Sequence, residues 1–410
     1  MMHRRDLFRQ TAGLAAAAVP TRGDLSHNRN LFTGDSCVYF YNPELWQPEG
    51  LPFSAKAIHR YVDTLADAGV DTFLSNPNAQ VAWYPSKKLE TVIDGYKRGD
   101  RDFFRAHARA TQVPADQLDT FLDHMVRFHN LYLDLVDAGV DWLAETVKAC
   151  RRRRIAPWVS VRMNDTHGVE DPASHFNCKV FRDPANRLSG RAVDPADKPN
   201  PHWVALNYAR KPVRDFMFSH IREYLEDYGF EGMELDWLRD PHVLEPGATD
   251  ADCQIVTNWL REVRAFTEAR GRITGKPVPL GLRIPSNLGY LRSRGLDVRA
   301  IARAGLVDFI GFSNFWQTSW DVPYEQLRAE IGPKVAIYGV VEDAPNWVPG
   351  HSPNFVAKTA QSGQAPYPNA GVRYMAASAP MLRANAAGKL AMGVHGIEQF
   401  NFFCTDQPKV

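Results

Sequence analysis

The chain has 410 residues, of which 44% are hydrophobic and 23% are charged, and its formal net charge is +1. This length suits one large α/β barrel domain or two ordinary domains. The balanced charge gives no reason to expect a nucleic-acid partner or binding to an anionic membrane surface.

The first 25 residues are predicted to be an export signal of the twin-arginine type. Residues 3–9, which include Arg4 and Arg5, resemble the twin-arginine motif, and an apolar stretch from residue 11 to residue 19 follows them. This stretch is too short to serve as a membrane span. We therefore expect residues 1–25 to direct export, and the protein to work in the periplasm or outside the cell.

Beyond the signal, short apolar runs alternate with stretches of helical spacing. Glycines such as Gly69, Gly229 and Gly305 lie where a helix would end just before the next strand. Repeated βα order with eight strands favours a single (β/α)8 TIM barrel over residues 26–410 rather than an open sheet. The eight predicted strands are Cys37–Tyr41, Asp71–Asn76, Ala156–Met163, Gly232–Asp236, Val278–Ile284, Val307–Phe312, Val335–Val341 and Gly396–Phe402.

Long loops are predicted after strands two, three and seven, over residues 77–114, 164–204 and 343–371. All three follow the carboxyl ends of strands, where barrel enzymes build their active sites. We therefore expect the functional residues to lie at these strand ends and in these loops.

The fourth predicted strand carries two carboxylates, Glu234 and Asp236, on one face, because side chains alternate along a strand. Burial of such a pair is unfavourable unless the acids are paired with cations or used in chemistry. One interpretation is structural, with a salt bridge from Asp236 to Arg239 or to an arginine on a neighbouring strand. The other interpretation is an active site.

Residues at the ends of the other strands indicate a sugar site. Carboxylates, arginines, asparagines and tryptophans gather there, and large amphipathic rings suit stacking on sugars. The predicted substrate-binding residues are Glu234, Arg162, Asn164, Arg239, Arg283, Asn314, Trp316, Trp237 and Asn401. Trp83, Trp320 and Trp347 are expected near the same mouth.

Glycoside cleavage needs two facing carboxyl groups, one protonated and one ionised. Asp236 on strand four and Glu342 on strand seven would face each other across the mouth, and Glu398 on strand eight is the competing partner. Arg162 and Arg283 would keep a neighbouring carboxylate ionised. We therefore expect Asp236 to be the nucleophile or base and Glu342 to be the acid.

Two segments carry a resemblance to a known family. Residues 232–239 are similar to the strand-four signature of glycosyl-hydrolase-like TIM barrels of the family-10-like group. Residues 393–401 look like the strand-eight ending of that group, whereas Glu231 replaces the usual Asp of the strand-four signature. The resemblance implies a barrel that acts on an oligosaccharide or polysaccharide, with Asp236 as an active-site carboxylate.

Two other functions fit the same barrel. One is a carbohydrate-binding barrel without catalysis, in which the acids hydrogen-bond sugar hydroxyls. The other is a metal-dependent hydrolase or lyase, although the spacing of its candidate ligands matches no metal motif. Those candidates are His167, His175, His202 and His242, with Asp165 or Asp240. We expect a carbohydrate substrate and neither a metal nor a cofactor.

Overall fold

The computed structural model describes residues 29–41, 43–47, 49–191, 203–238, 241–313, 320–342, 378–400 and 402. The predicted export signal, residues 1–25, lies outside these ranges, and so does the predicted loop after strand seven, residues 343–371.

Eight parallel strands form a closed barrel in chain order, and β8 pairs with β1 to close it. The predicted (β/α)8 barrel is therefore confirmed, because helices connect successive strands. The strands are β1 (Asn30–Asp35), β2 (Thr72–Asn76), β3 (Ala156–Arg162), β4 (Met233–Asp236), β5 (Leu280–Ile284), β6 (Phe309–Phe312), β7 (Ala336–Glu342) and β8 (Gly396–Phe400).

The first predicted strand is wrong. Residues 38–41 form a single helical turn, and β1 lies just before it, at Asn30–Asp35. In that turn, Phe40 stacks on Tyr132 with 4.2 Å between ring centroids. A short buried apolar run looks the same as a strand or as a helical segment. The real strand was missed because it carries polar side chains, including Asp35, at its carboxyl end.

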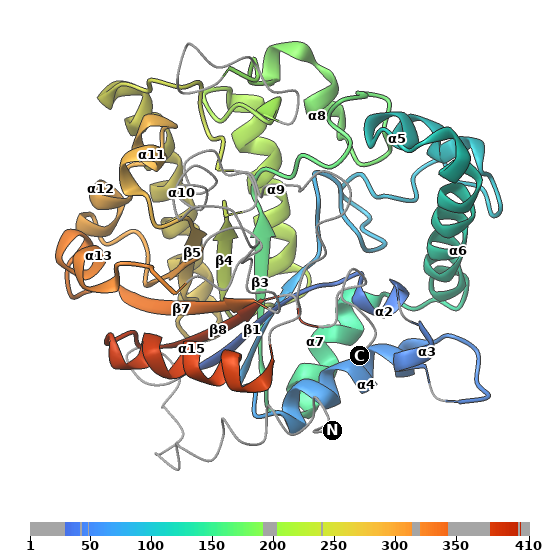
Figure 1. The fold of residues 1–410 in the computed structure, drawn as a ribbon, viewed down its shortest axis with the longest axis horizontal. Helices are drawn as coiled ribbons and strands as arrows, with labels where there is room; N and C mark the ends of the chain where they lie inside the picture. The colour runs from blue at the N-terminus through green and yellow to red at the C-terminus, as the bar shows by residue number, and fades with distance from the viewer. Residues whose placement is uncertain are drawn as a thin grey trace.

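The helices surround the barrel, and α15 packs beside β7 and β8 (Figure 1). The α-helices are α2 (Val38–Tyr41), α3 (Pro43–Trp46), α4 (Ala55–Asp67), α5 (Arg105–Ala110), α6 (Leu118–Asp137), α7 (Trp142–Arg152), α8 (Lys179–Arg182), α9 (Lys211–Glu226), α10 (Asp250–Thr274), α11 (Leu288–Ser293), α12 (Val298–Arg303), α13 (Tyr324–Ile331) and α15 (Ala379–Ala391). Three short 3-10 turns are η2 (Asp102–Phe104), η3 (Ala115–Gln117) and η4 (Pro184–Asn186).

The bounds of α10 follow from local chemistry at both ends. Its N-terminus has a capping box, in which the Thr249 side chain accepts from the backbone of Asp252 and the Asp252 side chain accepts from the backbone of Thr249. Its C-terminus stops at Gly275, whose φ of 71° is a left-handed conformation that favours glycine.

The chain between β2 and β3 is the longest described connection, and it carries α5, α6 and α7. Helix α7 packs against α4 and β3, as a barrel helix does. Helices α5 and α6 pack together to one side of the barrel, and α6 contacts α2 (Figure 1). The predicted loop over residues 77–114 therefore leads into an added helical layer.

The barrel interior is apolar at the amino-terminal end of the strands. An apolar layer of six side chains fills this end: Leu31, Leu74, Trp158, Phe309, Ala336 and Tyr338. Within it, Phe309 lies 5.4 Å from Trp158 and 5.8 Å from Tyr338 between ring centroids. Gly281 makes room for this packing, because an added Cβ would lie 2.2 Å from Cζ of Phe309.

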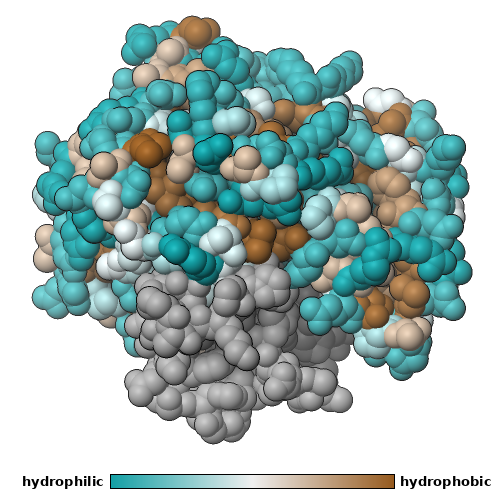
Figure 2. All heavy atoms as spheres, turned by 90° about the horizontal axis from the view of Figure 1, so that it is seen from above, coloured by the Kyte–Doolittle hydropathy of each residue, from teal (hydrophilic) through white to brown (hydrophobic). Residues whose placement is uncertain are grey.

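On the face seen in Figure 2, hydrophilic side chains cover much of the described surface, and apolar atoms gather in a band near the middle. Among the helices that the structure describes, no helix has both the length and the apolar character needed to cross a bilayer.

Replacing Gly281 with Ala should destabilise the protein by roughly 1–3 kcal/mol, because the extra methyl group would displace Phe309 from the apolar layer. Urea unfolding measures this loss. The matched control is Gly388→Ala in α15, where nothing lies within 4 Å of the added Cβ. That control should be neutral or stabilising, by roughly 1 kcal/mol at most. Equal unfolding midpoints for Gly281→Ala and wild type would contradict the packing described.

Candidate active site

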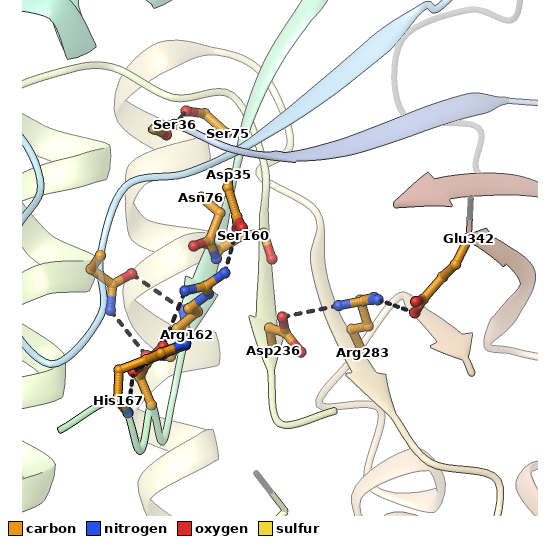
Figure 3. Close-up of polar contacts among 12 residues, drawn as sticks. Asp35, Ser36, Ser75, Asn76, Ser160, Arg162, His167, Asp236, Arg283 and Glu342 are labelled. Carbon is orange, nitrogen blue, oxygen red and sulfur yellow. Dashed lines mark hydrogen bonds and ion pairs between the residues drawn. The ribbon is translucent and has the colours of Figure 1, made fainter. Parts of the chain in front are cut away.

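One guanidinium at the mouth of the barrel contacts three carboxylates from three different strands. Nη1 of Arg283 lies 3.1 Å from Oδ2 of Asp236, and Nη2 lies 3.1 Å from Oε1 of Glu342. Nε of Arg283 lies 3.4 Å from Oε1 of Glu398. Figure 3 shows Arg283 between Asp236 and Glu342. The structure thus brings together the three predicted catalytic residues and one of the predicted substrate-binding arginines.

Each of these carboxylates has a second polar contact. The backbone N–H of Leu238 donates to Oδ1 of Asp236 at 2.9 Å. The hydroxyl of Thr33 donates to Oε1 of Glu398 at 2.9 Å. Glu342 accepts a longer hydrogen bond, 3.5 Å, from the hydroxyl of Ser313.

The Phe400 ring completes the surroundings of the guanidinium, since Cζ of Arg283 lies 3.5 Å from the ring centroid. A guanidinium over an aromatic face is attracted by the ring's negative charge distribution. Arg283 is therefore held by carboxylates at the edges of its plane and by a ring at its face.

Charge and burial set the protonation of Arg283 and of the buried glutamates near it. Burial disfavours the charged form of Arg283, but the carboxylates of Asp236, Glu398 and Glu342 raise its pKa overall. Burial raises the pKa of Glu398 to about 6, against the lowering effect of Arg283 and Thr33. Burial and then repulsion from Glu398 raise the pKa of Glu234 well above its ordinary value. Near neutral pH a proton is therefore held on Glu234, whereas Glu398, with a pKa of about 6, is largely ionised.

A second ion cluster surrounds Arg162 at the end of β3. Its guanidinium pairs with Asp35, and Nη1 lies 3.0 Å from Oδ2 of Asp165. The ring of Trp83 lies 5.3 Å from the guanidinium carbon. His167 contacts the other oxygen of Asp165, with Nδ1 and Oδ1 2.7 Å apart. Figure 3 shows this cluster apart from the one around Arg283.

Asp35 is a member of this cluster that sequence reasoning missed. It was missed because the first strand was assigned to residues 37–41. The alternation of Leu31, Thr33 and Asp35 along one face of β1 was the signal that could have found it, since Thr33 contacts Glu398 and Asp35 contacts Arg162.

Two predicted substrate-binding residues have other roles among the described residues. The Asn164 amide ties loops together: its Nδ2 donates to the carbonyls of Leu206 and His242, and its Oδ1 accepts from the Leu206 N–H. Trp237 is fully buried and packs on Tyr208 and Trp259, outside the barrel. It follows Asp236 in the strand direction, so it points to the opposite side. The expected position of Trp237 at the sugar-binding mouth is therefore wrong.

Other predicted residues lie outside the described part of the chain. These are Arg239, Asn314, Trp316, Asn401, Trp347, His202 and Asp240. Trp320 is described, and its side chain is 52% exposed.

The described histidines proposed as metal ligands lie in separate places. His242 contacts Nη2 of Arg294 at 3.0 Å, and His167 contacts Asp165. His175 is buried among aromatic rings, next to His107 and His129. Within the described ranges, no group of three or more His, Cys, Asp or Glu residues could hold a metal ion.

The three clustered histidines should make the protein sensitive to acid. Burial lowers the pKa of His107 to about 3 and that of His129 to about 4, and it lowers the pKa of His175 well below its ordinary value. The unfolded chain therefore binds protons that the folded protein excludes. The contribution of these histidines to the free energy of unfolding is complete above pH 6.5, the approximate pKa of histidine in the unfolded chain. It decreases as the pH is lowered, by ~2 kcal/mol per neutral histidine between pH 7 and pH 5.

Urea unfolding at the two pH values measures this loss. His175→Phe should reduce the loss, because it removes one titrating ring and keeps an aromatic side chain. The control His124→Gln changes an exposed histidine of α6 and should keep most of the pH dependence, because His124 is the smallest of the causes that act on the pKa of His129. A pH dependence identical in His175→Phe and wild type would contradict the burial of a neutral His175.

Replacing Arg283 with Met should destabilise the protein by roughly 3–5 kcal/mol at pH 7, because it leaves buried carboxylates unpaired. The deficit should shrink at lower pH, since protonation removes the unpaired charges. Denaturant unfolding at pH 7 and at pH 5 measures the loss of stability. The control Arg101→Met removes a pair with Asp119 in which the Arg101 side chain is 41% exposed, so it should lose less than about 1 kcal/mol. A deficit that does not change with pH would contradict this role of Arg283.

No family model matches the chain. A 1,4-alpha-glucan branching enzyme of Bradyrhizobium sp. (strain ORS 278) is 32% identical over 94 residues, which are 22% of this chain and 12% of that enzyme. The match thus spans about an eighth of the relative's length.

The solved structures to which the chain is similar include three carbohydrate-active enzymes. Chitinase ChiW from Paenibacillus sp. str. FPU-7 has a TM-score of 0.46 and 12% identity, with 92% of this chain and 31% of that chain covered. A class V chitinase from Nicotiana tobaccum has a TM-score of 0.41 and 11% identity, with 92% and 94% covered. A maltogenic alpha-amylase from Thermotoga neapolitana has a TM-score of 0.37 and 10% identity, with 77% and 59% covered. With similarities this low, the fold assignment rests on the strand pairing itself.

Proposed function

We propose that the protein is a glycoside hydrolase that acts on an oligosaccharide or polysaccharide at the barrel mouth. The observation that carries the proposal is the cluster of three carboxylates, from β4, β7 and β8, around the Arg283 guanidinium. These carboxylates lie at or near the carboxyl ends of the strands, where barrel enzymes carry out their chemistry.

Charge balance supports a pair with different protonation states. One guanidinium carries a single positive charge and faces three carboxyl groups, so it stabilises their full ionisation only in part. Asp236 receives both a guanidinium N–H and the backbone N–H of Leu238, which suits an ionised nucleophile or base. The acid is then Glu342 or Glu398, and we favour Glu342 because it lies at the end of its strand.

The geometry of the pair also fits the reaction. Asp236 and Glu342 contact the two terminal nitrogens of the same guanidinium. Since these nitrogens belong to one small rigid group, the two carboxyl groups stay within the roughly 9.5 Å that glycoside hydrolases use. In such a pair, the acid protonates the glycosidic oxygen while the ionised carboxylate attacks the sugar or activates a water.

We also propose that the protein is exported. The support is the twin-arginine-like sequence of residues 3–9 and the apolar stretch that follows it. Fractionation of cells that make the full chain, compared with a variant in which Arg4 and Arg5 are both lysine, tests this. Equal amounts outside the cytoplasm for both proteins would argue against it.

A second candidate is a carbohydrate-binding barrel without catalysis. It is favoured by the engagement of all three carboxylates with Arg283, because acids fixed by one cation can hydrogen-bond sugar hydroxyls without transferring protons. Binding of oligosaccharides with no release of reducing ends would support this candidate over hydrolysis.

Replacing Asp236 with Asn should lower hydrolysis by at least roughly 1,000-fold, because the nucleophile or base is lost. A panel of polysaccharides, including an α-1,4-glucan, with detection of reducing ends provides the assay. Glu342→Gln and Glu398→Gln identify the acid, since the larger loss marks it. The control Asp137→Asn changes a side chain that is 70% exposed on α6 and should leave the rate unchanged. Full activity in a folded Asp236→Asn protein would exclude the proposed role.

A further inference from the structure

Two glutamates meet inside the barrel, one layer below the mouth. Glu234 of β4 and Glu398 of β8 are both fully buried, and the apolar layer described above lies on the amino-terminal side of them. Strands β4 and β8 are not neighbours in the sheet, so these side chains meet across the interior. Two buried carboxyl groups in contact are stable only if they share a proton or bind cations.

Their contacts are unequal. Oε1 of Glu398 accepts from the Thr33 hydroxyl at 2.9 Å and lies 3.4 Å from Nε of Arg283. Oε1 of Glu234 accepts from the Ser160 hydroxyl at 2.8 Å. The cation therefore contacts Glu398, whereas Glu234 has a neutral donor.

The remaining oxygens are the key observation. The two carboxyl groups lie close enough for each to affect the pKa of the other. Oε2 of Glu234 and Oε2 of Glu398 are buried, and neither has a donor partner within the described ranges, so a proton between the two groups would satisfy both. A hydrogen bond between two carboxyl groups needs a proton on one of them. Space is also tight, because a Cβ added to Gly311 would lie 2.3 Å from Oε2 of Glu398.

We infer that Glu234 is a positioning residue that keeps a proton at neutral pH and donates it in a hydrogen bond to the Glu398 carboxylate. The asymmetry of the contacts places the negative charge on Glu398, beside Arg283, and the proton on Glu234. Burial and repulsion from Glu398 raise the pKa of Glu234 well above its ordinary value, which agrees with this assignment.

The other charged or titratable groups around the pair come from three elements. Asp236 of β4 and Arg283 of β5 act on both glutamates, with opposite effects on their pKa values. Tyr324 of α13 lies close enough for Glu398 to contribute to the raised pKa of its hydroxyl, after the larger effect of burial. Of these groups only Arg283 is a cation, and its charge is shared with Asp236 and Glu342.

The inference rests on the proposed function for its consequence. With Glu398 fixed by Glu234 and Thr33, Nε of Arg283 has a fixed partner, and its two terminal nitrogens point to Asp236 and Glu342. The proton on Glu234 also keeps a further negative charge away from the single guanidinium. Glu234 thus orients the pair at the mouth without contacting the sugar.

Infrared spectroscopy of the full protein tests the inference without any substrate. A protonated carboxylic acid has a carbonyl stretch separated from the carboxylate and amide bands. We expect this band in the wild type at pH 7, and a decrease of its intensity by one group per molecule in Glu234→Gln. The Gln amide can still donate to Glu398, so this variant should keep the wild-type melting temperature. The control Glu342→Gln should keep the component of the band that Glu234→Gln removes.

Absence of the band from the wild type at pH 7, or a band of undiminished intensity in folded Glu234→Gln, would overturn the inference. The wild-type spectrum alone can do so, which keeps the test valid even if a variant fails to fold. Because the measurement needs no turnover, a protein inactive on every carbohydrate would refute the proposed function and leave this result standing.

Discussion

The interaction on which the mouth of this barrel depends is the sharing of the Arg283 guanidinium by Asp236, Glu342 and Glu398. Each of these acids comes from a different strand, so one buried cation on β5 forms ion pairs with β4, β7 and β8. Removal of the cation would leave charges that have lost their water and have no partner, which is far less favourable than an exposed broken pair. Because one positive charge is shared by three carboxyl groups, it cannot neutralise all of them when they are ionised. This excess of acids over cations favours protonation of a carboxyl group.

The barrel interior is ordered so that this imbalance is tolerated. The apolar layer fills the amino-terminal end, the Glu234 and Glu398 pair lies above it, and the ionised groups lie at the mouth. Glycines permit this order: Gly281 makes room for the Phe309 ring and Gly311 for the Glu398 carboxyl group. The pair, with one proton between two carboxyl groups, thus separates the ionised groups of the mouth from the apolar packing, which agrees with the high free energy of an unpaired ion in such surroundings.

The two ion clusters at the mouth have different surroundings. Arg283 faces three carboxylates and a phenyl ring, whereas Arg162 faces two carboxylates and the indole of Trp83. Burial disfavours both cations, yet nearby carboxylates raise the pKa of each arginine. Both guanidiniums therefore stay charged.

The sequence alone determined the barrel and the position of Asp236. Repeated apolar runs located seven of the eight strands, and side-chain alternation placed Glu234 and Asp236 on one face. The same alternation places Trp237 on the other face, so its direction away from the mouth could have been predicted, whereas its contact with Tyr208 could not. Only the tertiary structure decided which arginine pairs with Asp236, that Asp35 contacts Arg162, and that Glu234 meets Glu398 across the barrel. The physical reason is that local periodicity fixes the direction of a side chain, whereas closure of the sheet decides which distant side chains it meets.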